Sequence, residues 1–221
     1  MLLKKGSRGN DVRTLQKLLN LQPDGIFGIL TEEAVKDFQR ENGLKVDGIV
    51  GDATWARLTD ASTLKTSKRS INEIIVHCTA TKEGVNCDID TIRKWHKARG
   101  FSDIGYHYVI YLDGSVHTGR DVNISGAHCL NHNTHSIGVC YVGGLDNNNK
   151  AKDTRTVKQK EALSKLLASL KILYPKARII GHRDTSPDLN GNGLIEPNEW
   201  VKDCPSFDAR KEYVSLSGLI K

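Results

Sequence analysis

Two of the eight histidines and one of the five cysteines stand where a metal site is expected. His77 and His182 each end an apolar, strand-like run (EIIVH and ARIIGH), and Cys204 lies in KDCPSF. Strand ends at one edge of a sheet are where α/β proteins collect functional groups. Two imidazoles and a thiolate suit a catalytic zinc, which lowers the pKa of a bound water and so makes it a nucleophile. The wide spacing, 105 and then 22 residues, leaves three purely structural side chains as an open alternative.

Most of the other histidines and cysteines have ordinary explanations. Four histidines lie in an amphipathic helix or near turns, where we expect solvated or hydrogen-bonded rings: His96, His117, His132 and His135. Cys78 and Cys140 fall in apolar runs, where a buried thiol behaves as a small hydrophobic group. An odd total of five cysteines favours reduced thiols over a disulfide framework, and so predicts synthesis in the cytosol.

The segment DLNGNGLIEPNE at 188–199 matches the calcium-binding loop of an EF-hand. Its residues at loop positions 1, 3, 5, 6, 8 and 12 are Asp188, Asn190, Asn192, Gly193, Ile195 and Glu199. Bound calcium would order the segment that carries Cys204. The alternative is an Asn/Gly-rich turn, because there is no second loop to pair with and no clear helix precedes this one.

An internal repeat occupies the first part of the chain. PDGIFGILTEEAV at 23–35 aligns with VDGIVGDATWARL at 46–58 at a constant offset of 23 residues. The matched pairs are Asp24 with Asp47, Gly25 with Gly48, Ile26 with Ile49, Gly28 with Gly51, and Thr31 with Thr54. Each unit predicts an Asp-Gly turn followed by a helix, the first one capped by Thr31. With NDVRTLQKLLN before them, they predict a three-helix domain over residues 1–58.

The rest of the chain predicts an α/β domain. Residues 59–70 are polar and predict a linker. From residue 71 to 221, strand-like and helical runs alternate, with a hairpin at Asp113–Gly114. The predicted strands are INEIIVH, YHYVIYL, SVHTGR, HSIGVCYVGG and ARIIGH, and the predicted helices are DIDTIRKWHKARG, closed by Gly100, and TVKQKEALSKLLASLKILYP, opened by a capping box of Thr156 and Gln159. We expect a mixed β-sheet flanked by helices.

Composition and charge limit the classes of partner that the protein is expected to bind. The net charge of +6 favours anionic partners, but the basic residues are scattered, with no nucleic-acid-binding motif, so we expect none of that class. No apolar run is long enough to span a bilayer, and the first residues lack the apolar core of a secretory signal. We therefore expect a monomer made in the cytoplasm, without membrane insertion.

Ordered motifs along nearly the whole chain resemble two known families. The run DGIFGILTEEAVKDFQRENGLKVDGIVGDATWARL resembles the peptidoglycan-binding domain 1 family, with both DG-x-x-G-x-x-T units and a closing TW-x-x-L. Residues 71 to about 214 resemble the type 2 N-acetylmuramoyl-L-alanine amidases, most closely the small phage-lysozyme type. The matching motifs are IIVHCTAT, GYHYVI, DGSVHTGR, GAHCLNHNTHSIGVCYVGG, IIGHRD and KDCPSFD.

The resemblance implies both the reaction and the residues that perform it. The zinc ligands would be His77, His182 and Cys204, with Tyr106 and Lys202 as catalytic side chains. Lys202 would stabilise the oxyanion of the tetrahedral intermediate, and the Tyr106 hydroxyl would donate a hydrogen bond or relay a proton. His128 is placed near the cleft as a substrate-binding residue, with a structural histidine as the alternative.

This reading predicts a phage or prophage endolysin. It would be made in the cytoplasm, reach the wall after a membrane lesion, and cut the amide between the muramoyl lactyl group and L-alanine. The alternatives are a peptidoglycan-recognition protein that binds without cutting, a recycling amidase for soluble muropeptides, and a lysin carried in the virion. Retention of Cys204 argues against the first, and the N-terminal repeat argues against the second.

Overall fold

The computed structural model describes residues 2–19, 21–59 and 64–217 of the chain. Its contacts divide the chain into two compact units. The first unit comprises residues 1–65, 165–176 and 213–221, and the second comprises 66–164 and 177–212. Every candidate site residue lies in the second unit, so the site is built within one compact body.

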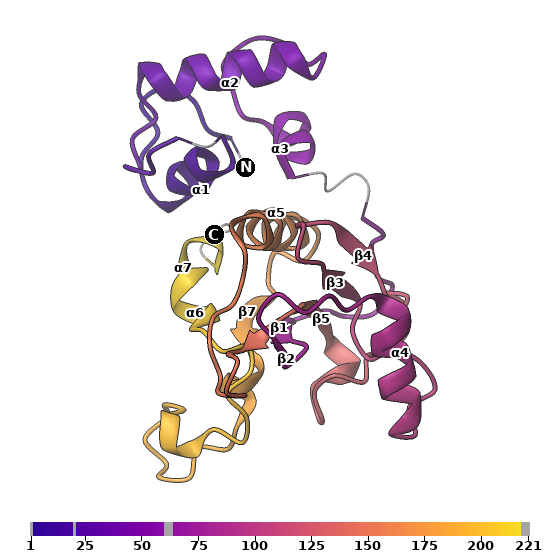
Figure 1. Cartoon of the computed structure of the whole chain (residues 1–221). Helices are drawn as coiled ribbons and strands as arrows, with labels where there is room; N and C mark the ends of the chain where they lie inside the picture. Colours follow the sequence, from indigo (N-terminus) through magenta and orange to yellow (C-terminus); the bar gives the residue numbers. More distant parts are fainter. Residues whose placement is uncertain (1, 20, 60–63, 218–221) are drawn as a thin grey trace. The chain divides into compact units, whose positions relative to one another are not determined.

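Three helices surround a small apolar core in the N-terminal part of the first unit (Figure 1). They are α1 (Asn10–Leu18), α2 (Ile29–Glu41) and α3 (Asp52–Thr59). The predicted apolar faces fill the core, where Leu15, Val35 and Trp55 are buried with others. Short bridges, Leu3 with Val50 and Arg8 with Ile26, close the loops around it. The predicted three-helix arrangement is therefore confirmed.

A buried glutamine organises the first repeat. The Gln16 amide nitrogen donates to the Asp24 carboxylate (2.6 Å), to the Ile26 carbonyl (3.1 Å) and to the Thr31 hydroxyl (3.1 Å). The Gln16 carbonyl oxygen accepts the Gly25 backbone N–H at 2.8 Å. One side chain thus satisfies the polar groups of the Asp-Gly turn and links that turn to α1 and α2.

The second repeat contains the same network. Gln39 stands 23 residues after Gln16, and its partners are Asp47, Gly48, Ile49 and Thr54. The distances are similar, with 3.1 Å to the Asp47 carboxylate and 2.9 Å from the Gly48 N–H. The repeat is therefore a repeat of hydrogen bonds as well as of sequence.

The predicted helix cap at Thr31 is wrong. Helix α2 begins at Ile29, with Gly28 as the residue before it, so Thr31 lies inside the first turn. Its hydroxyl donates to the Ile26 carbonyl (3.4 Å) and accepts from Gln16, instead of accepting a helical N–H. The side-chain network within the repeat has taken the hydroxyl that capping would have used.

A five-stranded mixed sheet in the order β4-β3-β5-β1-β7 forms the centre of the second unit. Strand β1 (Glu73–Cys78) lies between β5 (Ser136–Tyr141) and β7 (Arg178–Gly181), parallel to both. Strand β3 (Tyr108–Ile110) is parallel to β5 and antiparallel to β4 (Val116–Thr118). A two-stranded sheet pairs β2 (Thr81–Lys82) with β6 (Gly144–Leu145). All six residues of β1 and of β5 are buried, as expected for central strands with both faces covered.

Helices flank this sheet (Figure 1), which confirms the predicted fold class. In the second unit these elements are α4 (Ile89–Ala98), the first part of α5 (Val157–Leu173) and α6 (Ala209–Glu212), with 3₁₀ turns η2 (Asn133–His135), η3 (His182–Thr185) and η4 (Pro197–Glu199). The rest of α5 and α7 (Val214–Ser217) belong to the first unit. The capping box that opens α5 is confirmed by reciprocal bonds of 3.0 and 3.1 Å between Thr156 and Gln159. In the described ranges no helix is both long and apolar enough to cross a membrane.

The last residues of the predicted linker belong to the second unit. Residues 60–63 of the predicted 59–70 lie outside the described residues. Further along, the Ser67 hydroxyl donates to the Val122 carbonyl at 2.7 Å, and the Arg69 guanidinium donates to the carbonyls of Val122 and Ser136. These bonds join the start of the second unit to the segment that precedes β5.

Candidate functional site

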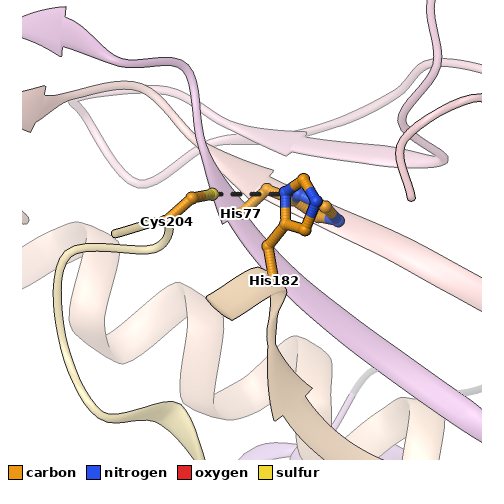
Figure 2. A group of neighbouring side chains, drawn as sticks. All are labelled: His77, His182 and Cys204. Carbon is orange, nitrogen blue, oxygen red and sulfur yellow. Dashed lines mark hydrogen bonds between the residues drawn. The ribbon is translucent and has the colours of Figure 1, made fainter. Parts of the chain in front are cut away.

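Three side chains that could bind a metal converge at one edge of the central sheet (Figure 2). His77 comes from the end of β1, His182 follows β7 directly, and Cys204 lies in the loop before α6. Their ligand atoms all lie within 4.8 Å of one another. Because β1 and β7 are adjacent and parallel, their carboxyl ends bring the two imidazoles to the same place. The structure thus brings together the three residues that the sequence singled out.

Backbone hydrogen bonds place the cysteine beside the histidines. The Cys204 carbonyl accepts the Arg183 backbone N–H at 2.7 Å, which ties its loop to the residue after His182. The Cys204 Sγ accepts the Cys78 backbone N–H at 3.3 Å and lies 3.8 Å from the His77 Nδ1. Sulfur is therefore held on the Nδ1 side of the His77 ring, by a donor that also favours a thiolate.

Burial sets the protonation of the two imidazoles. It is the main cause that lowers the pKa of His77 well below its usual value and lowers the pKa of His182 to about 4. Both rings are thus neutral near pH 7 and can offer a lone pair to a metal. The neighbouring Cys78 thiol, followed by burial, raises the pKa of Cys204. A bound cation would oppose that effect by favouring the thiolate, so this donor set fits a zinc ion.

His128 contacts the other side of the His77 ring. Its Nδ1 lies 3.0 Å from the His77 Nε2, while its Nε2 lies 3.4 Å from the Ser136 hydroxyl. The Asn133 side chain accepts the His128 backbone N–H at 2.8 Å. His128 thus contacts His77 on the side of the ring that faces away from the Cys204 sulfur. Hydrogen bonds hold both the backbone and the ring of His128 in place.

Two glycines make room for this ring. A Cβ added at Gly126 would lie 2.4 Å from the His128 Cδ2, and one added at Gly138 would lie 2.5 Å from the same atom. Neither space tolerates a methyl group without moving the imidazole. Gly126 and Gly138 therefore leave the space that the His128 imidazole occupies beside His77.

Tyr106 and Lys202 both lie close to the three converging side chains. The centroid of the Tyr106 ring is 5.2 Å from that of His77. Burial, as the main cause, raises the pKa of Tyr106 well above its usual value, so its hydroxyl stays protonated. Lys202 is exposed, and its charge is, after burial, the second cause that lowers the pKa of His182. A proton donor and a cation thus stand beside the candidate metal ligands.

The comparisons with known proteins agree with this geometry. A family model described as N-acetylmuramoyl-L-alanine amidase matches residues 67–198, more than half of the chain. The chain belongs to the N-acetylmuramoyl-L-alanine amidase family. This amidase also carries a match to the putative peptidoglycan binding domain over residues 8–58. The amidase match ends before Lys202 and Cys204, so the places of these two residues rest on the structure.

Relatives and solved structures extend the family assignment. The amidase is 38% identical over 146 residues to an endolysin of Klebsiella phage KP32, covering 66% of this chain and 87% of the relative. The endolysin amidase LysCS from Clostridium intestinale is 25% identical with a TM-score of 0.52, covering 69% of this chain and 86% of that structure. The family is typically zinc-dependent. The amidase is accordingly a hydrolase of peptidoglycan.

The recognition-protein alternative accounts for the fold alone. Drosophila PGRP-LB shares the fold with a TM-score of 0.50 at 21% identity, covering 69% of this chain and 85% of that structure. That identity is too low to carry function. The amidase reading is favoured because the endolysin relative matches at higher identity.

His107, which immediately precedes β3, was not identified from the sequence. It is fully buried, and its Nδ1 accepts the Gly138 backbone N–H at 2.9 Å. The Nε2 then carries the proton and donates to the Ile124 carbonyl at 3.1 Å, with the Arg69 guanidinium nearby. Its ring meets that of His128 edge-on at 5.6 Å. Its place in the motif GYHYVI was the available indication.

The structure gives the calcium prediction no support. Among the described residues, two groups of three His, Cys, Asp or Glu side chains could hold a metal, and neither lies in the loop 188–199. The Glu199 carboxylate is buried and accepts backbone N–H groups from Leu189, Asn190 and Glu196. Asp188 likewise accepts two backbone N–H groups from the loop. The carboxylates satisfy the loop's own amides, which agrees with the alternative of an Asn/Gly-rich turn.

Proposed function

We propose that this amidase cuts the bond between the muramoyl lactyl group and L-alanine with one zinc ion held by His77, His182 and Cys204. The observation that carries the proposal is the convergence of two neutral imidazoles and one sulfur within 4.8 Å. Three protein ligands leave a position open for water, as catalytic zinc sites require. Zinc there would polarise the amide carbonyl and make water nucleophilic near pH 7.

Tyr106 and Lys202 stabilise the charge that develops on the substrate. When the amide carbon becomes tetrahedral, its oxygen carries negative charge, and preorganised donors stabilise that charge strongly. The protonated Tyr106 hydroxyl donates a hydrogen bond, and the Lys202 ammonium supplies positive charge beside His182. The attacking water must lose a proton and the departing L-alanine amine needs one, so the Tyr106 hydroxyl would relay the proton from the water to the amine and end neutral, as it began.

We assign His128 to the positioning of His77. The His77 Nδ1 faces the Cys204 sulfur, so its Nε2 carries the proton and donates to the His128 Nδ1 at 3.0 Å. Histidine ligands of metals are commonly oriented through their second ring nitrogen in this way. The substrate contact that the sequence predicted for His128 stays a prediction beside this positioning role.

We propose that the N-terminal three-helix domain holds the enzyme on the wall. The support is the peptidoglycan-binding match over residues 8–58 and the separate core of this domain. An insoluble substrate favours such tethering, because it raises the local concentration of the catalytic domain. The endolysin relative makes lysis of a bacterial host the setting that we propose. A recycling amidase for soluble muropeptides would have no use for the domain.

Product analysis tests the reaction. Purified peptidoglycan is digested, and the products are identified by mass spectrometry. We expect stem peptides with a free L-alanine amino group and intact glycan chains from the wild type and from His117→Ala, a histidine outside the site. His182→Ala should release none and should bind one equivalent of zinc fewer than the wild type. Cleaved glycan, or a His182→Ala variant with normal zinc and turnover, would refute the proposal.

Sedimentation with insoluble sacculi tests the wall-binding role. We expect the full chain to sediment with the sacculi and the chain lacking residues 1–58 to stay largely in the supernatant. Hydrolysis of a soluble muropeptide by the shortened chain shows whether its catalytic domain is intact. Equal sedimentation of the two chains, with that hydrolysis retained, would remove the targeting role.

A further inference from the structure

We propose a second metal site, formed by Glu73, His132 and His135, that takes one divalent late transition-metal ion such as Zn²⁺. The ligand atoms of these three side chains also lie within 4.8 Å of one another. The Glu73 Oε2 is 2.7 Å from the His132 Nδ1 and 3.6 Å from the His135 Nε2. None of these residues belongs to the catalytic machinery, and the inference does not rest on the proposed function.

Local geometry brings the two histidines to one side. His132 immediately precedes the 3₁₀ turn η2, and His135 is its last residue. In a 3₁₀ turn, side chains three residues apart point in the same direction. Glu73 is opposite Ser136 in the β1–β5 register, and the Asn72 backbone N–H donates to the His135 carbonyl at 2.9 Å. The carboxylate is therefore delivered to the histidines by backbone pairing.

The donor set and its exposure suit a metal ion. Two imidazoles and one carboxylate match the ligands of zinc and of neighbouring metals such as nickel and cobalt. The Glu73 side chain is 4% exposed, whereas the two histidine side chains are 27% and 35% exposed. The buried carboxylate is thus held in place within the protein. An ion can reach the partly exposed histidines from solvent and complete its coordination with water.

Arg178 determines which oxygen of the carboxylate is available. Its guanidinium contacts the Glu73 Oε1 at 2.7 Å, leaving Oε2 to face the histidines. The Arg178 side chain is 73% exposed and can turn into solvent. In the metal-free protein this ion pair stabilises a buried carboxylate, and the bound ion would take over part of that role.

The second site is separate from the catalytic one. Glu73 and His77 are four residues apart on β1, which places their backbones about 13 Å apart on the same face of the strand. The side chain of Ile75 lies between them in sequence and packs with Cys129 and Ile180 in an apolar cluster. A metal at Glu73 would fasten the beginning of β1 to the segment that leads into β5.

Cobalt titration distinguishes the two sites. The probe is Co²⁺ added to the metal-free, untagged full chain, with bound metal measured by equilibrium dialysis. Cobalt bound to Cys204 gives a thiolate charge-transfer band, whereas cobalt bound by nitrogen and oxygen alone gives none. We expect two bound equivalents in the wild type and only one equivalent's worth of charge-transfer absorbance. Cys204→Ala should lose the band and keep one equivalent.

Surface variants test the second site directly. His135→Ala should bind one equivalent and keep the full charge-transfer band, and His132→Asn should do the same. His117→Ala, which removes an imidazole elsewhere, should still bind two. Far-ultraviolet circular dichroism confirms that each variant is folded. One equivalent that carries the full charge-transfer band in the wild type, or two in both His135→Ala and His132→Asn, would overturn the proposal. One equivalent without the band would instead count against the Cys204 site of the proposed function.

Discussion

The N-terminal domain and the catalytic unit of this amidase differ in how far apart in sequence their interacting residues lie. In the N-terminal domain, Gln16 bonds to residues only 8 to 15 positions away, and Gln39 repeats the pattern. In the catalytic unit, Cys204 meets His77 across 127 positions. Local networks leave a periodic trace in the sequence, whereas a site assembled by a parallel sheet leaves only isolated residues at strand ends. We expect the long-range assembly to perform the chemistry and the local networks to supply stability.

The largest effect is expected from Tyr106→Phe and Lys202→Ala. Each should lower turnover on the order of 100-fold to 1,000-fold, because each removes one donor to the oxyanion. Neither is a proposed ligand, so the zinc content should stay at the wild-type level. Steady-state hydrolysis of a soluble muropeptide measures the first and metal analysis the second. Tyr111→Phe is a matched control, and unchanged rates in both variants would remove these residues from the mechanism.

Acid should weaken the catalytic unit through His107. Burial is the main cause that lowers its pKa to about 4, against about 6.5 in the unfolded chain. Because the unfolded state binds the proton first, the stability gained from neutral His107 is complete above pH 6.5 and is lost as pH falls towards 4. The loss amounts to about 3 kcal/mol at most. Urea unfolding at several pH values should show a shallower acid decline in His107→Asn, and an identical decline would refute the assignment.

A smaller effect is expected at the residue that positions His77. His128→Ala should weaken zinc binding by about 10-fold to 100-fold, because the imidazole ligand loses its outer partner. Gly138→Ala should act in the same direction by displacing the ring. Competition with a chelator measures the affinity, with His117→Ala as the control. Wild-type affinity in both site variants would show that His77 needs no such partner.

The last expected effect is on the stability of the N-terminal domain and leaves the chemistry unchanged. Gln16→Ala and Gln39→Ala should each cost about 1–3 kcal/mol, because each leaves a buried glycine N–H without its acceptor. Exposed Gln22 gives the control Gln22→Ala. Denaturant unfolding should show similar losses for the two variants and no change in muropeptide hydrolysis. A large loss in one and none in the other would show that the two repeats are not equivalent.

Much of the fold was predictable because its determinants are local. The 23-residue repeat, the capping box of Thr156 and Gln159, and the apolar runs of β1, β5 and β7 each lie within a short window. The cap at Thr31 failed because its hydroxyl is taken by Gln16, whose part in the repeat was not recognised. A propensity rule gave way to a tertiary hydrogen bond.

The candidate site was only partly predictable. Strand ends marked His77 and His182, and the chemistry of a thiolate proposed Cys204 as the third ligand, but only the resemblance added Tyr106 and Lys202. His107 could not be assigned, because its partners come from separate segments of the chain. The grouping of Glu73 with two histidines depends in the same way on the β1–β5 register, which no local pattern reports.

Zinc-edge X-ray absorption tests the central claim most directly. The amidase is loaded with one equivalent of zinc, and the ligand shell is measured in the wild type, in Cys204→Ala and in Cys87→Ala as a control. We predict one sulfur at about 2.3 Å and nitrogen ligands at about 2.0–2.1 Å in the wild type and the control. The sulfur should be absent in Cys204→Ala, together with the amidase activity. A wild-type shell without sulfur, or one that Cys204→Ala leaves unchanged, would contradict the account.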